Sequence, residues 1–269
     1  MATKATLFII DPQYDFCNPK GSLYVPGAEK DSERTAQMIR KYRGDIHDIQ
    51  ITLDSHHPIH IAHPKFWIDG NRNHPTPFTL ISVEDVESGK YTPTAPKLRD
   101  LALNYVRTLR DNNRYILCIW PEHCLIGSIG ATVEEQIFGA MYEWESEMRI
   151  AGKTTKGSNP FTEHYSALKA DVVMPNDPAT GLNDALIETI SKSAGNSIIG
   201  IMGQALSHCV ASTGRDLFEN LSPADLKKVY ILEDATSNVP GFEKLGRDFL
   251  DYASGLGVNI TTTDKFFHN

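Results

Sequence analysis

The sequence has few cysteines and no long apolar runs. Four cysteines in 269 residues are too few for a disulfide framework. No run approaches the roughly 18 consecutive apolar residues that a membrane-spanning helix needs. The first residues lead directly into a strand-like run, without the apolar region of a secretory signal. We therefore expect a cytoplasmic protein whose reduced cysteines serve as core residues, ligands or nucleophiles.

The sequence also has no excess of basic residues. Lys and Arg number 26 against 34 Asp and Glu, so the formal net charge is −8, and no basic stripe is visible. This balance argues against nucleic acid and anionic membrane as partners. Apolar residues make up 41% and charged residues 22%, which is ordinary globular usage and excludes a disordered, collagen-like or coiled-coil chain.

Short apolar runs alternate with segments of helical period. This alternation predicts βαβ units and an α/β fold, with three α/β/α layers around a mainly parallel sheet. Ligands of such sheets bind at the carboxyl ends of the strands, where Asp11, Asp54, Trp120 and Gly203 fall. The predicted strands are 7–10, 49–53, 115–120, 197–202, 229–232 and 258–261.

Three segments between the predicted strands have apolar residues on one helical face. Thr132 and Glu135 fit a capping box at the start of the second segment. The three sets are Leu98, Leu101, Ala102, Tyr105 and Leu109; Val133, Ile137, Ala140, Met141, Trp144 and Met148; and Phe242, Leu245, Phe249 and Tyr252.

The stretch from about 61 to 113 fits this alternation poorly. It begins with a segment, 64–77, that is rich in Pro, Asn, His and Gly, and it ends in a predicted helix. Because it has too few apolar residues for a core of its own, we predict an excursion within one domain that spans 1–269.

Cys209 is the cysteine best placed to act as a nucleophile. It follows the predicted strand 197–202 by a short turn, and residues 210–218 then follow helical spacing. In the first turn of a helix, free amides and the helix dipole favour a thiolate and can hold an oxyanion. A buried structural cysteine is the alternative.

An acidic and a basic residue are candidates to assist such a nucleophile. Asp11 ends the first predicted strand, where a carboxylate can act as a general base, although a turn aspartate is the alternative and Asp15 competes with it. Lys156 can stabilise a thiolate or oxyanion if it is partly buried. As a surface residue it would have no such role, and Lys153 has an equal claim on composition.

A cluster of histidines follows the second predicted strand. Asp54 and His56 are two residues apart, so both point to one side of an extended segment. A carboxylate with imidazoles suits Zn, Fe or Mn, and His123 is the best candidate for a third ligand from elsewhere. A polar histidine-rich loop, which also includes His57, His60 and His63, is the alternative.

Five stretches together resemble the isochorismatase-like cysteine hydrolases, and the nicotinamidase branch in particular. They occur in the order of the family's motifs, which makes the resemblance more specific than any one of them. The stretches are 10–17 (IDPQYDFC), 53–60 (LDSHHPIH), 120–124 (WPEHC), 156–157 (KG) with 163–167 (EHYSA), and 203–210 (GQALSHCV).

The resemblance implies roles for particular residues. It implies a catalytic triad of Asp11, Lys156 and Cys209, and hydrolysis of a small amide, most simply nicotinamide, through a thioester. It also implies a bound divalent metal, with zinc first and iron or manganese as alternatives. The further implied residues are Asp54, His56 and His123 as metal ligands, with His60 as a fourth ligand or a supporting residue; Ala205 and Cys209 as oxyanion-hole amides, with a cis bond between Gln204 and Ala205; and Phe16, Trp120 and Tyr165 in the substrate pocket. His57 and His63 are assigned to the loop.

The chain departs from the family pattern at several positions. Ser55 stands where an aromatic residue separates the first two metal ligands, and Ile59 replaces an acidic residue. The segments before Trp120 and before Lys156 are longer than usual and should reshape the pocket mouth or a subunit contact. Another small amide or carbamoyl substrate, an isochorismatase-type vinyl ether, a catalytically silent binding protein and a homo-oligomer therefore stay open.

Overall fold

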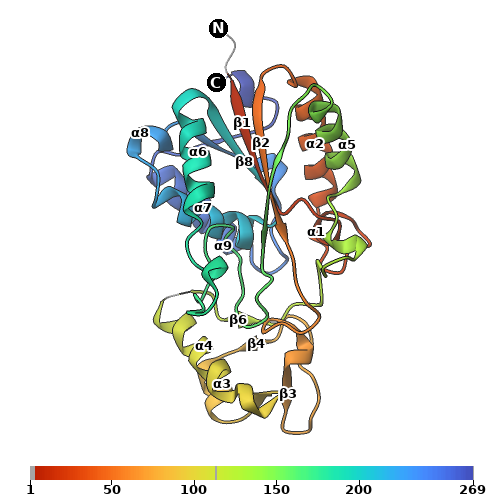
Figure 1. The fold of residues 1–269 in the computed structure, drawn as a ribbon, viewed down its shortest axis with the longest axis vertical. Helices are drawn as coiled ribbons and strands as arrows, with labels where there is room; N and C mark the ends of the chain where they lie inside the picture. Colours follow the sequence, from red (N-terminus) through yellow and green to blue (C-terminus); the bar gives the residue numbers. More distant parts are fainter. Residues whose placement is uncertain (1–3, 113, 269) are drawn as a thin grey trace.

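Six parallel strands form the central sheet of the computed structural model, which describes residues 4–112 and 114–268. Their order is β10-β9-β8-β1-β2-β7. Helices cover both faces, which confirms the predicted three-layer α/β/α fold (Figure 1). The strands are β1 (Ala5–Ile10), β2 (Ile46–Asp54), β7 (Gly152–Lys156), β8 (Ile198–Gly203), β9 (Val229–Leu232) and β10 (Asn259–Thr261).

The central strand β1 is buried along its whole length because both faces of the sheet are covered. Leu7 and Ile9 pack with apolar residues of α2 (Ala28–Lys41) and α5 (Glu135–Glu145). Phe8 and Ile10 belong to the apolar cluster of the opposite face. That face is covered by α6 (Asp184–Asn196), α7 (Ala211–Phe218) and α9 (Glu243–Gly255) (Figure 1).

One predicted strand does not belong to the central sheet. Of residues 115–120, Leu117–Cys118 form β6, which pairs antiparallel with β4 (Leu80–Ile81). The place at the sheet edge is taken by β7, whose sequence GKTTK contains no apolar residue. An edge strand pairs on one side and needs little apolar surface, so β7 gives no apolar signal in the sequence.

The excursion lies at the end of the molecule towards which β1 and β2 run (Figure 1). Its elements are β3 (Trp67–Asp69), β4, α3 (Val83–Glu87), β5 (Tyr91–Pro93) and α4 (Arg99–Asp111), and β3 pairs antiparallel with β5. Trp67, Val86 and Tyr105 pack in the same apolar cluster as Phe8 of β1. This shared core supports the single domain 1–269, which stays a prediction.

Two of the predicted helices, α4 and α9, form as expected, while α5 differs at both ends. The expected capping box is wrong, because Glu134 caps α5 by accepting hydrogen bonds from the N–H groups of Gln136 and Ile137. Met148 lies beyond the end of α5 and is 97% exposed, so its predicted place on the buried face is wrong.

The remaining short elements connect the layers. They are α1 (Tyr14–Cys17), the π-helical turn Leu206–Val210 that leads into α7, and α8 (Pro223–Leu226). Among residues 4–112 and 114–268, no helix combines the length and the apolar character needed to cross a bilayer.

The packing of α7 on α9 yields a stability test. A Cβ at Gly214 would overlap the buried ring of Phe249, so Gly214→Ala should lower the free energy of unfolding by about 1–3 kcal/mol. Gly195→Ala, in α6, is the matched control because nothing lies within 4 Å of its added Cβ. Urea unfolding measures both variants, and equal stabilities would contradict this packing.

Candidate active site

Four adjacent strands deliver the principal candidate residues to one edge of the sheet. Asp11 follows β1, Asp54 ends β2 and Lys156 ends β7, where the register pairs it with Asp54. Cys209 follows β8, whose last residue pairs with the last residue of β1. Since the carboxyl ends of parallel strands meet at one edge, these side chains converge although they lie up to 198 positions apart in the sequence.

The ammonium of Lys156 lies at the centre of this group. Its Nζ is 2.8 Å from Asp11 Oδ2, 3.1 Å from Asp54 Oδ1 and 3.6 Å from Cys209 Sγ. The side chain is buried. Burial disfavours the ammonium, but the two carboxylates outweigh burial and raise the pKa of Lys156 well above its usual value. The lysine is therefore charged at neutral pH.

Asp11 is held by its neighbour in the sheet. Thr52 Oγ1 donates a hydrogen bond to Asp11 Oδ1 at 2.6 Å and accepts one from the Asp11 N–H at 3.0 Å. The backbone of Asp11 has φ +44°, a left-handed conformation that aspartate tolerates better than most residues. Burial raises the pKa of Asp11, while the adjacent ammonium opposes that shift. A raised pKa suits a group that takes up and returns a proton.

Cys209 lies in the π-helical turn that precedes α7 and is almost fully buried. From its position near a helix terminus, Cys209 is expected to be a thiolate. Burial instead raises the pKa of the Cys209 thiol well above its usual value, although the charge of Lys156 opposes the shift. The resting side chain is therefore a thiol, and a nucleophilic role requires a base that removes its proton.

The turn before Cys209 contains Ala205, which lines the pocket. The peptide bond between Gln204 and Ala205 is cis, as the sequence predicts. Among the described residues no acceptor is found for the Ala205 N–H, whereas the neighbouring N–H groups of Gln204 and Leu206 donate to Ile10 and Ser237. The roles of Ala205 and Cys209 as oxyanion-hole amides stay predictions.

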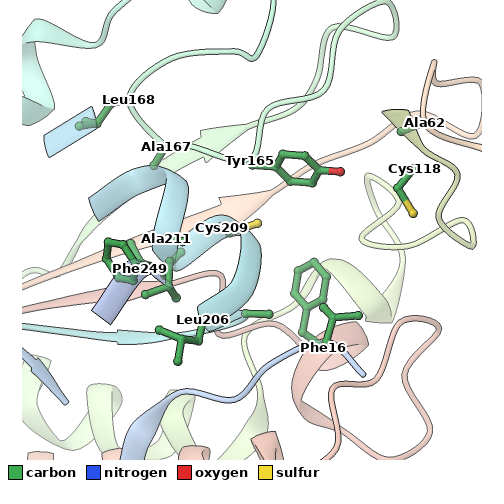
Figure 2. Packing of buried hydrophobic residues seen from close by; sticks show 14 of the residues in the cluster. Phe16, Ala62, Cys118, Tyr165, Ala167, Leu168, Leu206, Cys209, Ala211 and Phe249 are labelled. Atoms are coloured by element: carbon green, nitrogen blue, oxygen red, sulfur yellow. The ribbon is translucent and has the colours of Figure 1, made fainter. Parts of the chain in front are cut away.

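A pocket opens beside Cys209. Its wall includes all three aromatic residues predicted from the sequence, and Trp120 Nε1 donates a hydrogen bond to Tyr165 Oη at 2.9 Å. Figure 2 shows the sulfur of Cys209 directed to the side on which the rings of Phe16 and Tyr165 lie. The complete lining is Phe16, Leu23, Val25, Asp54, Trp120, His123, Glu163, Tyr165, Ala205, His208, Cys209 and Val239.

Several residues that line the pocket are not predicted from the sequence. His208 directly precedes Cys209, and burial lowers the pKa of its imidazole to about 3, so the ring is neutral. Its position beside the nucleophile candidate was the available signal. Leu23, Val25 and Val239 come from loops without periodicity, and nothing in their local sequence marks them as lining residues.

The predicted metal ligands Asp54, His56 and His123 lie close together, and Asp54 and His123 line the pocket. Asp54 Oδ2 lies 2.9 Å from His56 Nε2 and 3.4 Å from His123 Nε2, and all three side chains are buried. Although burial favours the neutral carboxyl group, the charges of His56 and Lys156 hold the pKa of Asp54 well below its usual value.

A glutamine fixes the main chain of Asp54. Gln13 Nε2 donates to the Asp54 carbonyl, and Gln13 Oε1 accepts from the Asp54 N–H, both at 2.7 Å. This double hydrogen bond sets the position from which the carboxylate faces Lys156 on one side and the imidazoles on the other.

The histidines that follow His56 differ in burial: His57 is exposed, whereas His60 and His63 are buried. His57 is exposed and belongs to the loop, as predicted. His63, also assigned to the loop, is completely buried and lies with His56 and His123 in a set whose ligand atoms are all within 4.8 Å, so its ring is not solvated as that of His57 is. A second such set joins His56 with His60 and Glu163. Buried imidazoles beside a carboxylate, with His63 Nε2 unpartnered among the described residues, fit a transition metal.

Lys153 and Asp15, the sequence alternatives to Lys156 and Asp11, have other partners. Lys153 lies on the outer side of β7, is half exposed and faces Glu145 at 3.7 Å. Asp15 accepts hydrogen bonds from the N–H groups of Ser22 and Cys124 and so fixes two loops. Neither residue contacts Cys209.

Comparison with known proteins identifies the fold. No family model matches the chain. The chain is 26% identical over 208 residues to the nicotinamidase of Saccharomyces cerevisiae, which covers 77% of this chain and 78% of that one. The solved structure of the yeast nicotinamidase matches with a TM-score of 0.65 at 22% identity, over 96% of this chain and 99% of the other.

Two further solved structures are more distant. A pyrazinamidase of Pyrococcus horikoshii in complex with zinc matches at 20% identity and a TM-score of 0.54, over 96% of this chain and 99% of that one. An isochorismatase-like hydrolase of Alkaliphilus metalliredigens matches at 15% identity and a TM-score of 0.52, over 99% and 98%. The chain therefore has the isochorismatase-like hydrolase fold, which confirms the expected fold.

Gly157 gives a test of the geometry around Asp54. A Cβ there would lie 2.7 Å from Asp54 Oδ1 and 2.8 Å from His56 Cε1. Gly157→Ala should therefore displace both side chains and weaken Zn²⁺ binding, measured by competition with a chelator. Gly127→Ala is the control, because Gly127 has nearly the same φ (+85° against +83°) and nothing within 4 Å.

Each of these two variants should lose about 1–2 kcal/mol of unfolding free energy for a left-handed alanine. Only Gly157→Ala should also lose metal affinity. Wild-type Zn²⁺ affinity in Gly157→Ala would contradict the close contact.

Proposed function

We propose that this chain of isochorismatase-like hydrolase fold is a cysteine-dependent amide hydrolase, and that its substrate is nicotinamide. The observation that carries the proposal is the position of the Lys156 ammonium, within 2.8 Å of the Asp11 carboxylate and 3.6 Å of the Cys209 sulfur. A nucleophile, a base and a cation thus adjoin one pocket, which is what acyl transfer requires. The similarity to a yeast nicotinamidase supports the choice of substrate.

In the first half of the reaction Asp11 takes the proton of the Cys209 thiol. The thiolate then attacks the amide carbon, and the carbonyl π electrons move to oxygen. The Ala205 and Cys209 amides receive this oxyanion. Asp11 returns the proton to the amide nitrogen, the C–N bond breaks, and ammonia leaves a thioester on Cys209.

The second half repeats these steps with water. Asp11 removes a proton from a water molecule, whose oxygen attacks the thioester carbon. When the tetrahedral intermediate collapses, the C–S bond breaks, and Asp11 returns the proton to the Cys209 sulfur. The carboxylic acid then leaves. Lys156 stays charged throughout and limits the repulsion between Asp11 and the thiolate.

The metal part of the proposal concerns substrate binding. Asp54, His56 and His123 would hold a zinc ion, or iron or manganese, beside the pocket. The ion would supply Lewis acidity for binding the ring nitrogen of the substrate. The pyrazinamidase of Pyrococcus horikoshii in complex with zinc supports this choice. Phe16, Trp120 and Tyr165 would flank the flat ring.

A second candidate is another small amide or carbamoyl compound. Glu163 and the neutral His208 give the pocket two polar groups beyond the predicted set, and these can bind a substrate different from nicotinamide.

With nicotinamide, the reaction would serve the salvage of nicotinamide for NAD. The cytoplasmic location and a homo-oligomeric state stay predictions.

Ammonia release from nicotinamide is the direct test. The purified protein should release ammonia and nicotinate, and Cys209→Ala should abolish the release while it leaves the fold intact. Cys118→Ala is the matched control, since Cys118 is a buried cysteine that does not line the pocket. A panel of small amides and carbamoyl compounds compares kcat/KM values. No release from any member of the panel would favour a silent binding protein.

The two lysines of β7 form a second test. Lys156→Ala should lower kcat by at least ~10²-fold, as should Asp11→Asn, which keeps the shape but removes the proton acceptor. Lys153→Ala should change kcat little, because its ammonium faces the surface. Steady-state kinetics and circular dichroism check activity and folding. A larger loss in Lys153→Ala than in Lys156→Ala would contradict the assignment.

A further inference from the structure

Two of the metal-ligand candidates share one hydrogen-bonding pattern. His56 Nδ1 donates to the Gly157 carbonyl at 3.0 Å, and His123 Nδ1 donates to the Pro121 carbonyl at 2.8 Å. A carbonyl can only accept, so Nδ1 carries a proton in both rings, and in the neutral form that binds a metal the lone pair is on Nε2. Both Nε2 atoms face Asp54 Oδ2. Ligating histidines are commonly oriented by such a backbone carbonyl.

His63 repeats this pattern. Its Nδ1 donates to the Pro58 carbonyl at 3.4 Å, which leaves the lone pair on Nε2. That Nε2 is buried and has no hydrogen-bond partner in the described part of the chain. A ring nitrogen of His63 lies within 4.8 Å of a ring nitrogen of His56 and of one of His123. A buried lone pair without a donor is costly, and a cation between these atoms would satisfy it.

His60 has the opposite arrangement. Its Nε2 donates to the Thr162 carbonyl at 3.0 Å, and its Nδ1 accepts from the Ala62 N–H at 3.2 Å. Both ring nitrogens are therefore used by the backbone, and no lone pair is left for a metal. The Ala62 carbonyl in turn accepts from the Trp120 N–H, so His60 fixes the loop that carries His63.

From this contrast we infer that His63 is a ligand of the metal together with Asp54, His56 and His123, and that His60 is a positioning residue. The inference rests on the metal-dependent part of the proposed function. Three imidazoles and one carboxylate form a donor set for a late divalent transition metal such as zinc, rather than for magnesium or calcium, which prefer oxygen ligands.

The test compares His63→Gln with the matched control His60→Gln in metal binding rather than in turnover. Metal is removed from each protein by chelation, and the affinities for Zn²⁺ and Co²⁺ are measured by competition with a chromophoric chelator. His63→Gln should weaken binding by at least ~10²-fold, since it removes a direct ligand, and should change the visible absorption spectrum of bound Co²⁺. His60→Gln should weaken binding less than ~10-fold and keep that spectrum.

Unchanged affinity and an unchanged Co²⁺ spectrum in His63→Gln, or a larger loss in His60→Gln, would overturn the inference. X-ray absorption of the zinc-loaded wild-type protein gives a second measurement that needs no variant. Scattering from three imidazoles supports the inference and scattering from two overturns it. A wild-type protein that binds no transition metal would remove the metal part of the proposed function as well. Metal binding with an unchanged His63→Gln would remove only the role of His63.

Discussion

One buried ammonium holds the candidate site together. Asp11 and Asp54 are both buried, and both carboxylates contact the ammonium of Lys156. Without its positive charge the two carboxylates would repel each other. The lysine can reach both because the register of β7 on β2 sets it beside Asp54. The carboxylates are fixed separately, Asp11 by Thr52 and Asp54 by Gln13. The geometry therefore follows from sheet pairing rather than from mobile loops.

The fold and most of the candidate site could be predicted because short stretches of sequence indicate them. The strands β1, β8 and β9 are apolar runs; Asp11 stands directly after β1, and Cys209 follows β8 by a short turn. The edge strand β7 gives no such signal, since its residues alternate between the surface and the interior without an apolar side chain. The run 115–120 is apolar because it packs against the excursion, and an apolar run does not reveal which sheet it joins.

The histidines show a second limit of sequence patterns. Spacing separates His56 from His57, because successive residues of an extended segment point to opposite sides. It cannot rank His60 against His63, because that choice depends on which backbone groups occupy each ring nitrogen. The protonation of Cys209 is a similar case. Position near a helix terminus favours a thiolate, but the depth of burial depends on side chains from remote segments, such as Phe16 and Tyr165, and burial dominates.

The chain segments that lead into and out of the excursion lie side by side. The Trp120 N–H donates to the Ala62 carbonyl, and the His56 N–H donates to the Cys124 carbonyl, so backbone hydrogen bonds join the strands of chain on both sides of the inserted segment. Closing a longer loop between fixed ends adds little entropic cost, which rises only with the logarithm of its length. The excursion can thus differ in length while its two ends stay joined by these hydrogen bonds, provided that buried residues such as Trp67 and Tyr105 keep their places in the core that they share with β1.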